Sequence, residues 1–298
     1  MWKYFLIASV GSAVVSNSFG QIKKQFSVED REIVEKVELK LSTKTGNCFI
    51  RPSQNSDLLN IYSNQDLGDY GHAFRNDIQG NTAMVSLSLE QEGNRGVGQK
   101  ISYQVLGREE RPSEKFWKVY LTENKPYSLE LDYGLGNANI DLSGLSIQQL
   151  KIKTGSADVN VFYGSGAENK IKMDTFFVKV DMGSLTARQL NLARSSVVMA
   201  NVGFGNIMLD YSDTPTNSNH VKGSIGAGNL VVLLPGADTP VMVKINNSWL
   251  CSLELCKSLK RVSENTFVNS AYTEGGKNTL TFDLDVSLGK IVFKDKSE

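Results

Sequence analysis

Histidine is scarce in this sequence: His72 and His220 are the only two among 298 residues. A catalytic triad or a zinc site needs histidine or several converging ligands. Neither histidine has a partner at metal-ligand spacing, because no His-x-x-x-His or Cys-x-x-Cys pattern occurs. Ser195-Ser196 also lacks the glycine-serine-glycine setting that exposes a nucleophile. The sequence therefore predicts no catalytic residue, no metal site and no cofactor.

Net charge is absent as well. The 32 basic and 32 acidic residues cancel, and the sequence pI is about 6.8. A protein without a net field is not drawn to polyanions, so nucleic acid is not an expected partner.

No apolar run has the length of a membrane span. The apolar stretch at residues 4–15 is shorter than the roughly 20 residues that a spanning helix needs. It follows Lys3 and precedes the small-residue exit at 18–20, a pattern typical of a secretory signal peptide. We predict that residues 1–20 are removed ahead of Gln21 and that the mature chain is exported: periplasmic, at the cell surface or secreted. No transmembrane segment is expected after signal removal.

Cysteine is limited to Cys48, Cys251 and Cys256, an odd number in a compartment where disulfides persist. Cys251 and Cys256 are close enough in sequence for a local disulfide. Alternatively, all three are small buried apolar residues. Both interpretations stay open from the sequence.

Strand patterning is what the sequence does contain. From Val37 onward, short runs alternate apolar and polar residues, as in Val37-Glu38-Leu39-Lys40-Leu41, and glycine or asparagine ends each run. A period of two residues indicates strands with one buried face.

A glycine phrase recurs along the chain, in which Gly precedes a small or polar residue and then an alternating strand. Steps of 19, 28, 22 and 23 residues separate its copies from Gly136 to Gly228, close to one coil of a β-solenoid. A coil turns sharply between strands, and glycine accepts a positive φ without strain. The predicted structural turn glycines are Gly136, Gly155, Gly183, Gly205, Gly228 and Gly289, with an earlier copy at Gly46.

Three segments depart from this rhythm, one ahead of the first strands and two between them. The charged segment 26–37 predicts one short helix, and the polar, glycine-containing segment 66–82 predicts a long loop. Segment 246–264 carries Trp249, several leucines and two cysteines. It predicts a compact loop or short helix that covers one open face or one end of the stack, because solenoids need capping.

The stretch 127–161, with its Gly134-Leu-Gly-Asn-Ala-Asn-Ile and Gly155-Ser-Ala-Asp-Val phrases, resembles the Toastrack family. Segments 202–211, 225–235 and 284–293 extend the likeness. Together they resemble the C-terminal domain of LiaF-type cell-envelope stress proteins, over roughly residues 115–295. The resemblance implies a right-handed single-stranded β-helix with a non-enzymatic role in sensing, scaffolding or adhesion, and it brings no site residues. The export signal departs from the membrane-spanning bundle of LiaF-type proteins.

Two alternatives for function come from strand residues. Carboxylates along a solenoid face occur in glycan-active enzymes, but lysines occupy similar outward positions, which favours a solvated surface. Exposed tyrosines could form a binding strip, although each could instead cap the edge of a coil. The carboxylates are Asp132, Asp141, Asp158, Asp210, Asp283 and Asp285; the lysines are Lys151, Lys153, Lys172 and Lys179; the tyrosines are Tyr133, Tyr163, Tyr211 and Tyr272.

The sequence therefore predicts an all-β protein, a right-handed single-stranded β-helix or solenoid-like stack with an N-terminal β region. We divide it into a signal peptide at 1–20, an N-terminal β region at 21–115 and a Toastrack/LiaF-like solenoid at 116–298. The expected function is a non-catalytic exported envelope module, adhesin-like or a stress-associated scaffold, that binds an envelope protein or cell-wall glycan. The alternatives are a secreted carbohydrate-active β-helix enzyme, a glycan-binding protein or a periplasmic module with an apolar cavity for a small ligand.

Overall fold

The computed structural model describes residues 22–64, 70–91 and 116–296, and almost all of its regular structure is β-strand. The 17 strands of these described residues form one continuous hydrogen-bonded sheet. The predicted signal peptide lies outside the described residues. Within them, no helix is long and apolar enough to cross a membrane.

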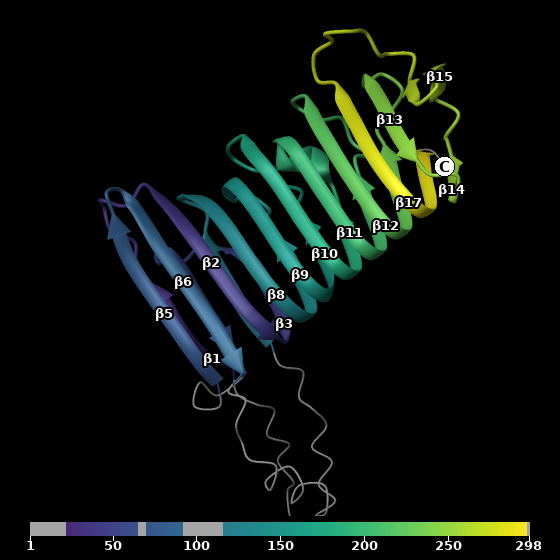
Figure 1. Cartoon of the computed structure of the whole chain (residues 1–298). Coiled ribbons are helices and arrows are strands. Elements are labelled where there is room, and N and C mark those ends of the chain that lie inside the picture. Colours follow the sequence, from purple (N-terminus) through teal and green to yellow (C-terminus); the bar gives the residue numbers. More distant parts are fainter. Residues whose placement is uncertain (1–21, 65–69, 92–115, 297–298) are drawn as a thin grey trace, which may run out of the picture.

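A stack of long, bent, parallel strands makes up the centre of the molecule (Figure 1). Neighbouring strands pair in register, and each one passes through a corner, so that its first half lies in one layer and its second half in the other. The predicted all-β stack of coils is confirmed. The strands are β8 (Pro126–Asp141), β9 (Ser146–Phe162), β10 (Met173–Ala187), β11 (Ser195–Asp210), β12 (Asn219–Leu234) and β17 (Leu280–Asp295).

The N-terminal strands extend both layers. In the front layer, β2 (Lys36–Thr45) pairs with the first half of β8, and then come β6 (Thr82–Gln91) and β5 (Tyr70–Gln79). In the back layer, β3 (Asn47–Ser53) pairs with the second half of β8. The back layer continues with β7 (Phe116–Thr122), β4 (Leu59–Ser63) and β1 (Lys23–Val28). Strands from both sides of residue 115 thus share one sheet, while the domain boundary there stays a prediction.

The C-terminal end is covered by a chain insertion between β12 and β17. Its strands β13 (Val241–Asn247) and β14 (Cys251–Glu254) pair with the two halves of β17. The antiparallel strands β15 (Lys260–Ser263) and β16 (Thr266–Val268) follow. Segment 246–264 therefore ends the stack with strands, and the expected loop or short helix is replaced by sheet pairing.

Two further expectations were wrong. Segment 26–37 forms no helix, because β1 runs to Val28 and β2 begins at Lys36, with Val28 and Val34 both buried. Residues 70–79 of the expected loop form β5, which pairs with β6 along its whole length. Phe74 and Ile78 pack against the core, which a surface loop would not require. Residues 65–69 lie outside the described residues.

The core fills the space between the layers. Alternating residues of each strand point inward, as Tyr127, Leu129 and Leu131 do in β8. Near the C-terminal end, the Phe282 ring lies 5.7 Å from Tyr211 and 6.0 Å from Phe293, edge to face in both cases. The core is thus filled with aliphatic and aromatic side chains.

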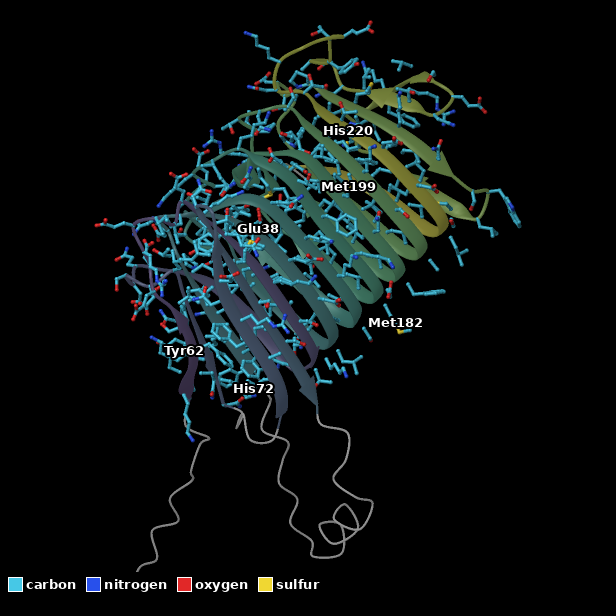
Figure 2. The ribbon with its side chains drawn as sticks, turned by 60° about the vertical axis from the view of Figure 1, so that its left-hand side comes forward. Glu38, Tyr62, His72, Met182, Met199 and His220 are labelled. Carbon is cyan, nitrogen blue, oxygen red and sulfur yellow. The ribbon has the colours of Figure 1, made fainter. Side chains whose placement is uncertain are left out.

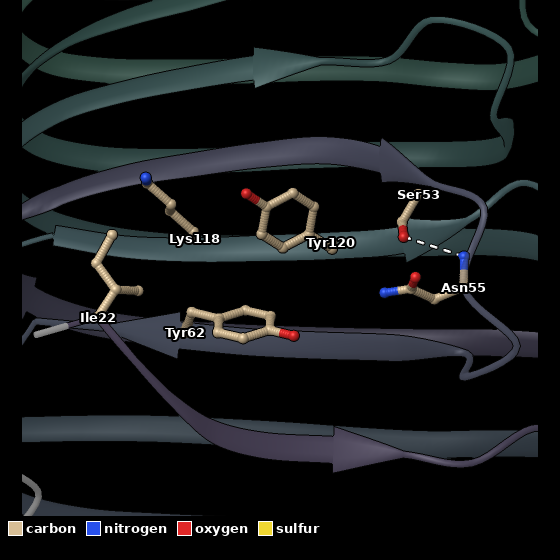
Figure 3. Close-up of a pocket in the computed structure, with 6 residues that line it drawn as sticks. All are labelled: Ile22, Ser53, Asn55, Tyr62, Lys118 and Tyr120. Carbon is tan, nitrogen blue, oxygen red and sulfur yellow. Dashed lines mark hydrogen bonds between the residues drawn. The ribbon is translucent and has the colours of Figure 1, made fainter.

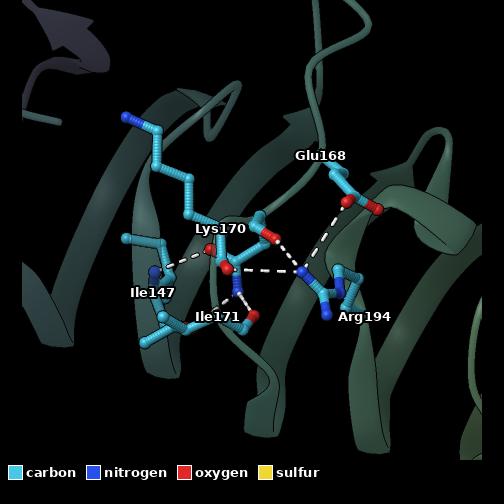
Figure 4. A network of polar contacts seen from close by, with 6 residues as sticks. Ile147, Glu168, Lys170, Ile171 and Arg194 are labelled. Carbon is cyan, nitrogen blue, oxygen red and sulfur yellow. Dashed lines mark hydrogen bonds and ion pairs between the residues drawn. The ribbon is translucent and has the colours of Figure 1, made fainter.

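Return turns opposite the corners are joined by buried amides. The Asn169 side chain accepts a hydrogen bond from the backbone N–H of Ile147 at 2.7 Å and donates to the carbonyl oxygens of Ile147 and Ile171. Arg194 on the next coil donates to the Asn169 and Lys170 carbonyl oxygens and lies 3.6 Å from Glu168 (Figure 4). These contacts satisfy backbone groups that the return turn would otherwise leave unpaired inside the protein. The short 3-10 helix η2 (Leu190–Ala193) precedes Arg194.

Candidate functional site

In five of the six long bent strands named above, the corner is built around a glycine with positive φ. The φ angles lie between 122° and 145° at Gly136, Gly183, Gly205, Gly228 and Gly289. Any Cβ on Gly205 would lie 1.6 Å from the Gly183 carbonyl oxygen of the preceding coil. Conformation and space therefore both require glycine at this corner.

Gly155 does not belong to this column, which corrects the sequence prediction. The register places Ala157 opposite both Gly136 and Gly183. Gly155 instead stacks on Gly134, the first glycine of the Gly-x-Gly phrase. With Ala157 in the column, the steps from Gly136 to Gly228 become 21, 26, 22 and 23 residues. The phrase that begins at Gly155 looks like the other glycine phrases, so the sequence assigned this corner to Gly155. Strand register places the corner two residues later, at Ala157.

The corner also turns apolar side chains outward. Before and after it, buried residues alternate with outward ones, but in β8, β10, β11 and β17 the residue just before the corner glycine is left in solvent. The exposed fractions are 52% for Leu135, 57% for Met182, 64% for Phe204 and 48% for Leu288. Strand register places these side chains in one column, with Ser156 and Ala227 between them. We call this column the corner ridge; Figure 2 shows Met182 projecting from that edge.

The corner ridge is long and concentrated. Adjacent strands lie about 4.8 Å apart, so Leu135 and Leu288, five strands apart, are separated by about 24 Å. Trp249, 90% exposed, and Leu250 continue it, because the Gly289 N–H donates to the Leu250 carbonyl oxygen. Six of the nine large hydrophobic residues exposed in the described part of the chain thus lie on this edge. An exposed apolar patch of this kind typically marks an interaction surface.

A second surface lies on the back layer at the N-terminal end of the stack. A shallow groove of about 350 Å³ is lined by Ile22, Ser53, Asn55, Tyr62, Lys118 and Tyr120. Tyr62 comes from β4, Lys118 and Tyr120 from β7, and Asn55 follows β3 (Figure 3). We call this surface the tyrosine groove.

The tyrosine groove contains two aromatic rings and one lysine, and Arg51 lies next to it on β3. The Tyr62 and Tyr120 rings are perpendicular, with centroids 5.6 Å apart. The Lys118 ammonium lies 4.9 Å from the centre of the Phe116 ring. Among the described residues, neither Lys118 nor the adjacent Arg51 has a carboxylate within ion-pair distance. The groove therefore combines ring surface with uncompensated positive charge.

The tyrosines named from the sequence do not form a binding strip. Tyr133, Tyr163 and Tyr211 are buried, and Tyr272 is half-buried. Burial raises the pKa of the Tyr163 hydroxyl above its usual range. Sequence reasoning missed Tyr62 and Tyr120, although each alternates with a buried apolar neighbour and is therefore predicted to point outward.

The acidic residues named from the sequence are dispersed. Asp141 accepts hydrogen bonds from the backbone N–H groups of Ser143 and Gly164, and Asp210 accepts one from Ser212, so both stabilise turns. Asp158 lies next to the corner, while Asp132, Asp283 and Asp285 lie on first halves of strands. In the part of the chain that is described, no three His, Cys, Asp or Glu side chains are grouped to hold a metal ion.

All three cysteines are free thiols in the structure. Burial raises the pKa of the Cys48 thiol to about 12, and burial also raises the pKa of the Cys251 and Cys256 thiols. Because the thiolate is the reactive form, we expect Cys48 to resist thiol reagents at pH 8 in the native protein. The Cys251–Cys256 disulfide stays a prediction. Thiol counting in denaturant without reductant decides it: one thiol shows the disulfide, and three show free cysteines.

Both the sequence and the fold of this chain are similar to those of known proteins. The family model described as the N-terminal domain of toast_rack, DUF2154, matches residues 16–183, more than half of the chain. No curated protein matches this sequence. A proposed cell adhesion protein from Clostridium sporogenes ATCC 15579 superimposes with a TM-score of 0.43 at 15% identity, covering 92% of this chain and 100% of the other. A proposed adhesin from Bacteroides fragilis NCTC 9343 has a TM-score of 0.32 at 12% identity, covering 92% and 97%. At these scores, neither structure carries an argument about function.

Proposed function

Because this chain belongs to the toast_rack family, we propose that it is a non-catalytic interaction module of the cell envelope, which docks an envelope partner along the corner ridge. The adhesin-like and stress-scaffold roles are two forms of this function. The LiaF-type assignment is part of the same proposal.

The corner ridge is the observation that supports this proposal. Four large apolar side chains stand in solvent at the corner position of four of the six coils, held by strand pairing on both sides. Exposing them to water is unfavourable unless a partner removes them from it. A hydrogen-bonded stack keeps the spacing of these side chains constant, so little conformational entropy is lost when a partner binds.

Export is the second part of the proposal. It is supported by the cation, apolar stretch and small-residue exit within residues 1–20, which lie outside the described residues. In the envelope, the partner would be a protein or a cell-wall glycan.

Removing the ridge tests the function. We expect the purified protein to sediment saturably with isolated envelope fragments, and the double variant Met182→Ser/Phe204→Ser to bind about tenfold more weakly or worse, because each lost apolar contact is worth about 1 kcal/mol or more. Val262→Ser is the matched control, because Val262 is 61% exposed but lies on β15, outside the ridge. It should bind like the wild type.

Two results would contradict the proposal. Equal binding by wild type and the double variant would show that the ridge does not dock the partner. Release of soluble oligosaccharides from wall material by the purified protein would show an enzyme. Circular dichroism of each variant establishes that the stack is intact.

A further inference from the structure

We propose that the tyrosine groove binds an acidic saccharide, a sugar chain that carries carboxylates. The inference deepens the glycan branch of the proposed function and rests on that function for its setting in the envelope. It uses residues on the opposite layer from the first halves of the coils and none from the corner ridge. The two ideas can therefore fail separately.

Strand pairing builds the groove from segments distant in sequence. In the antiparallel pair of β4 and β7, Tyr62 lies directly across from Lys118. In the parallel pair of β3 and β7, Arg51 lies beside Tyr120. Ile61 and Val119, their neighbours in sequence, are buried, so the tyrosines and cations share the outward face. Side chains directly across a sheet lie about 5 Å apart, which suits a ligand the size of one sugar ring.

The tyrosine rings offer what a sugar needs from a protein. A pyranose has an apolar face of C–H groups that packs on an aromatic ring, with hydroxyl groups around its edge. The two rings contact each other edge to face at 90° and 5.6 Å, so a sugar would pack on their outer surfaces along the open groove and not between them. Within the described residues, neither tyrosine hydroxyl forms a hydrogen bond, and both tyrosines line the groove. Ser53 accepts a hydrogen bond from the Asn55 N–H at 3.2 Å, which holds the Asn55 amide at the rim (Figure 3).

The charges select an anionic sugar. Lys24, also on this layer, is already neutralised by Asp57 at 3.2 Å, and Lys151 by Glu130 at 2.7 Å. Lys118 and Arg51 differ, because no carboxylate of the described part pairs with them. Charge-assisted hydrogen bonds from ammonium and guanidinium groups to a carboxylate are stronger than those to a neutral hydroxyl.

The position of the groove disfavours a peptide. An extended peptide gains affinity by adding a strand at a free sheet edge. Here β4 pairs with β1 on one side and β7 on the other, and β7 pairs with β3. The groove therefore lies on the face of the sheet, where only side chains can contact a ligand.

Calorimetric titration of the full chain tests the proposal. The probes are trigalacturonic acid, neutral maltotriose and citrate as a carboxylate without a sugar. We expect trigalacturonic acid to bind at least about tenfold more tightly than either other probe, the size of effect that a lost charged or stacking contact produces. Affinity should fall as salt rises. If citrate binds as tightly as trigalacturonic acid, the groove recognises only the carboxylate and not the sugar. If maltotriose binds as tightly, the cations do not contribute to recognition. Either result overturns the proposal.

Variants assign the binding to the groove. Tyr120→Ala and Lys118→Gln should each weaken trigalacturonic acid binding about tenfold. Lys222→Gln is the matched control, because Lys222 is an exposed lysine in the first half of β12, which lies in the front layer and away from the groove. If Tyr120→Ala and Lys118→Gln bind like the control, the groove is not the site. The double variant Met182→Ser/Phe204→Ser leaves the groove unchanged and should bind the saccharide like the wild type. A loss of envelope binding in this variant therefore reports on the corner ridge and not on the groove.

Discussion

Replacing Gly205 with valine is expected to lower the free energy of unfolding by about 2–5 kcal/mol, or to prevent the stack from forming. The backbone at Gly205 has a φ of 145°, a region that residues with a Cβ rarely adopt. Its Cβ would also lie 1.6 Å from the Gly183 carbonyl oxygen and displace β11 from β10. Backbone strain of about 1–2 kcal/mol and overpacking of about 1–3 kcal/mol combine at this one position.

Urea unfolding monitored by circular dichroism measures the effect. Gly236→Val is the control, because a Cβ at Gly236 would have nothing within 4 Å and its φ is not positive. We expect its midpoint to change little. An unchanged midpoint for Gly205→Val would mean that the corner does not require glycine, and the stacking model of the coils would be wrong.

Truncating Phe282 to alanine should cost about 3–5 kcal/mol of stability, the usual range for a buried phenylalanine. Phe282 is fully buried in β17, between the rings of Tyr211 and Phe293. Its removal leaves a cavity where the last coil meets the rest of the stack, because β17 lies between β12 and the cap strands. Loss of the two edge-to-face contacts adds to the cost of the cavity.

The same substitution at Phe204 is the matched comparison. Phe204 is 64% exposed on the corner ridge, so Phe204→Ala should change the free energy of unfolding by less than about 0.5 kcal/mol. Equal losses for the two variants would show that Phe204 is covered in the folded protein. If Phe204 contributes to binding and not to stability, Phe204→Ala should weaken envelope binding while leaving the free energy of unfolding nearly unchanged.

Strand content and corner glycines could be predicted from the sequence. Alternation such as Val37-Glu38-Leu39 reports burial of one strand face, a local property, and the Toastrack resemblance of residues 127–161 agrees with the family match. Positive φ at five of the six predicted turn glycines follows from the same local pattern. These features depend on neighbours within a few residues.

Three expectations failed because neighbours distant in sequence decided them. Residues 70–79 look like a polar loop, but β6 supplies hydrogen-bond partners for the whole segment as β5. Segment 26–37 has helix-like charge, yet burial of Val28 and Val34 places it in the sheet. Gly155 begins a phrase like the others, but pairing with β8 and β10 places Ala157 in the corner column.

The sequence by itself determined which residues alternate inward and outward and where the chain must turn. Only the tertiary structure decided which outward residues are neighbours. Leu135 and Leu288 join one ridge, and Tyr62 and Tyr120 one groove, through strand pairing that brings together residues far apart in the chain. The physical reason is that a period of two assigns a side chain to a face of its own strand, whereas the register between strands depends on packing of the whole core.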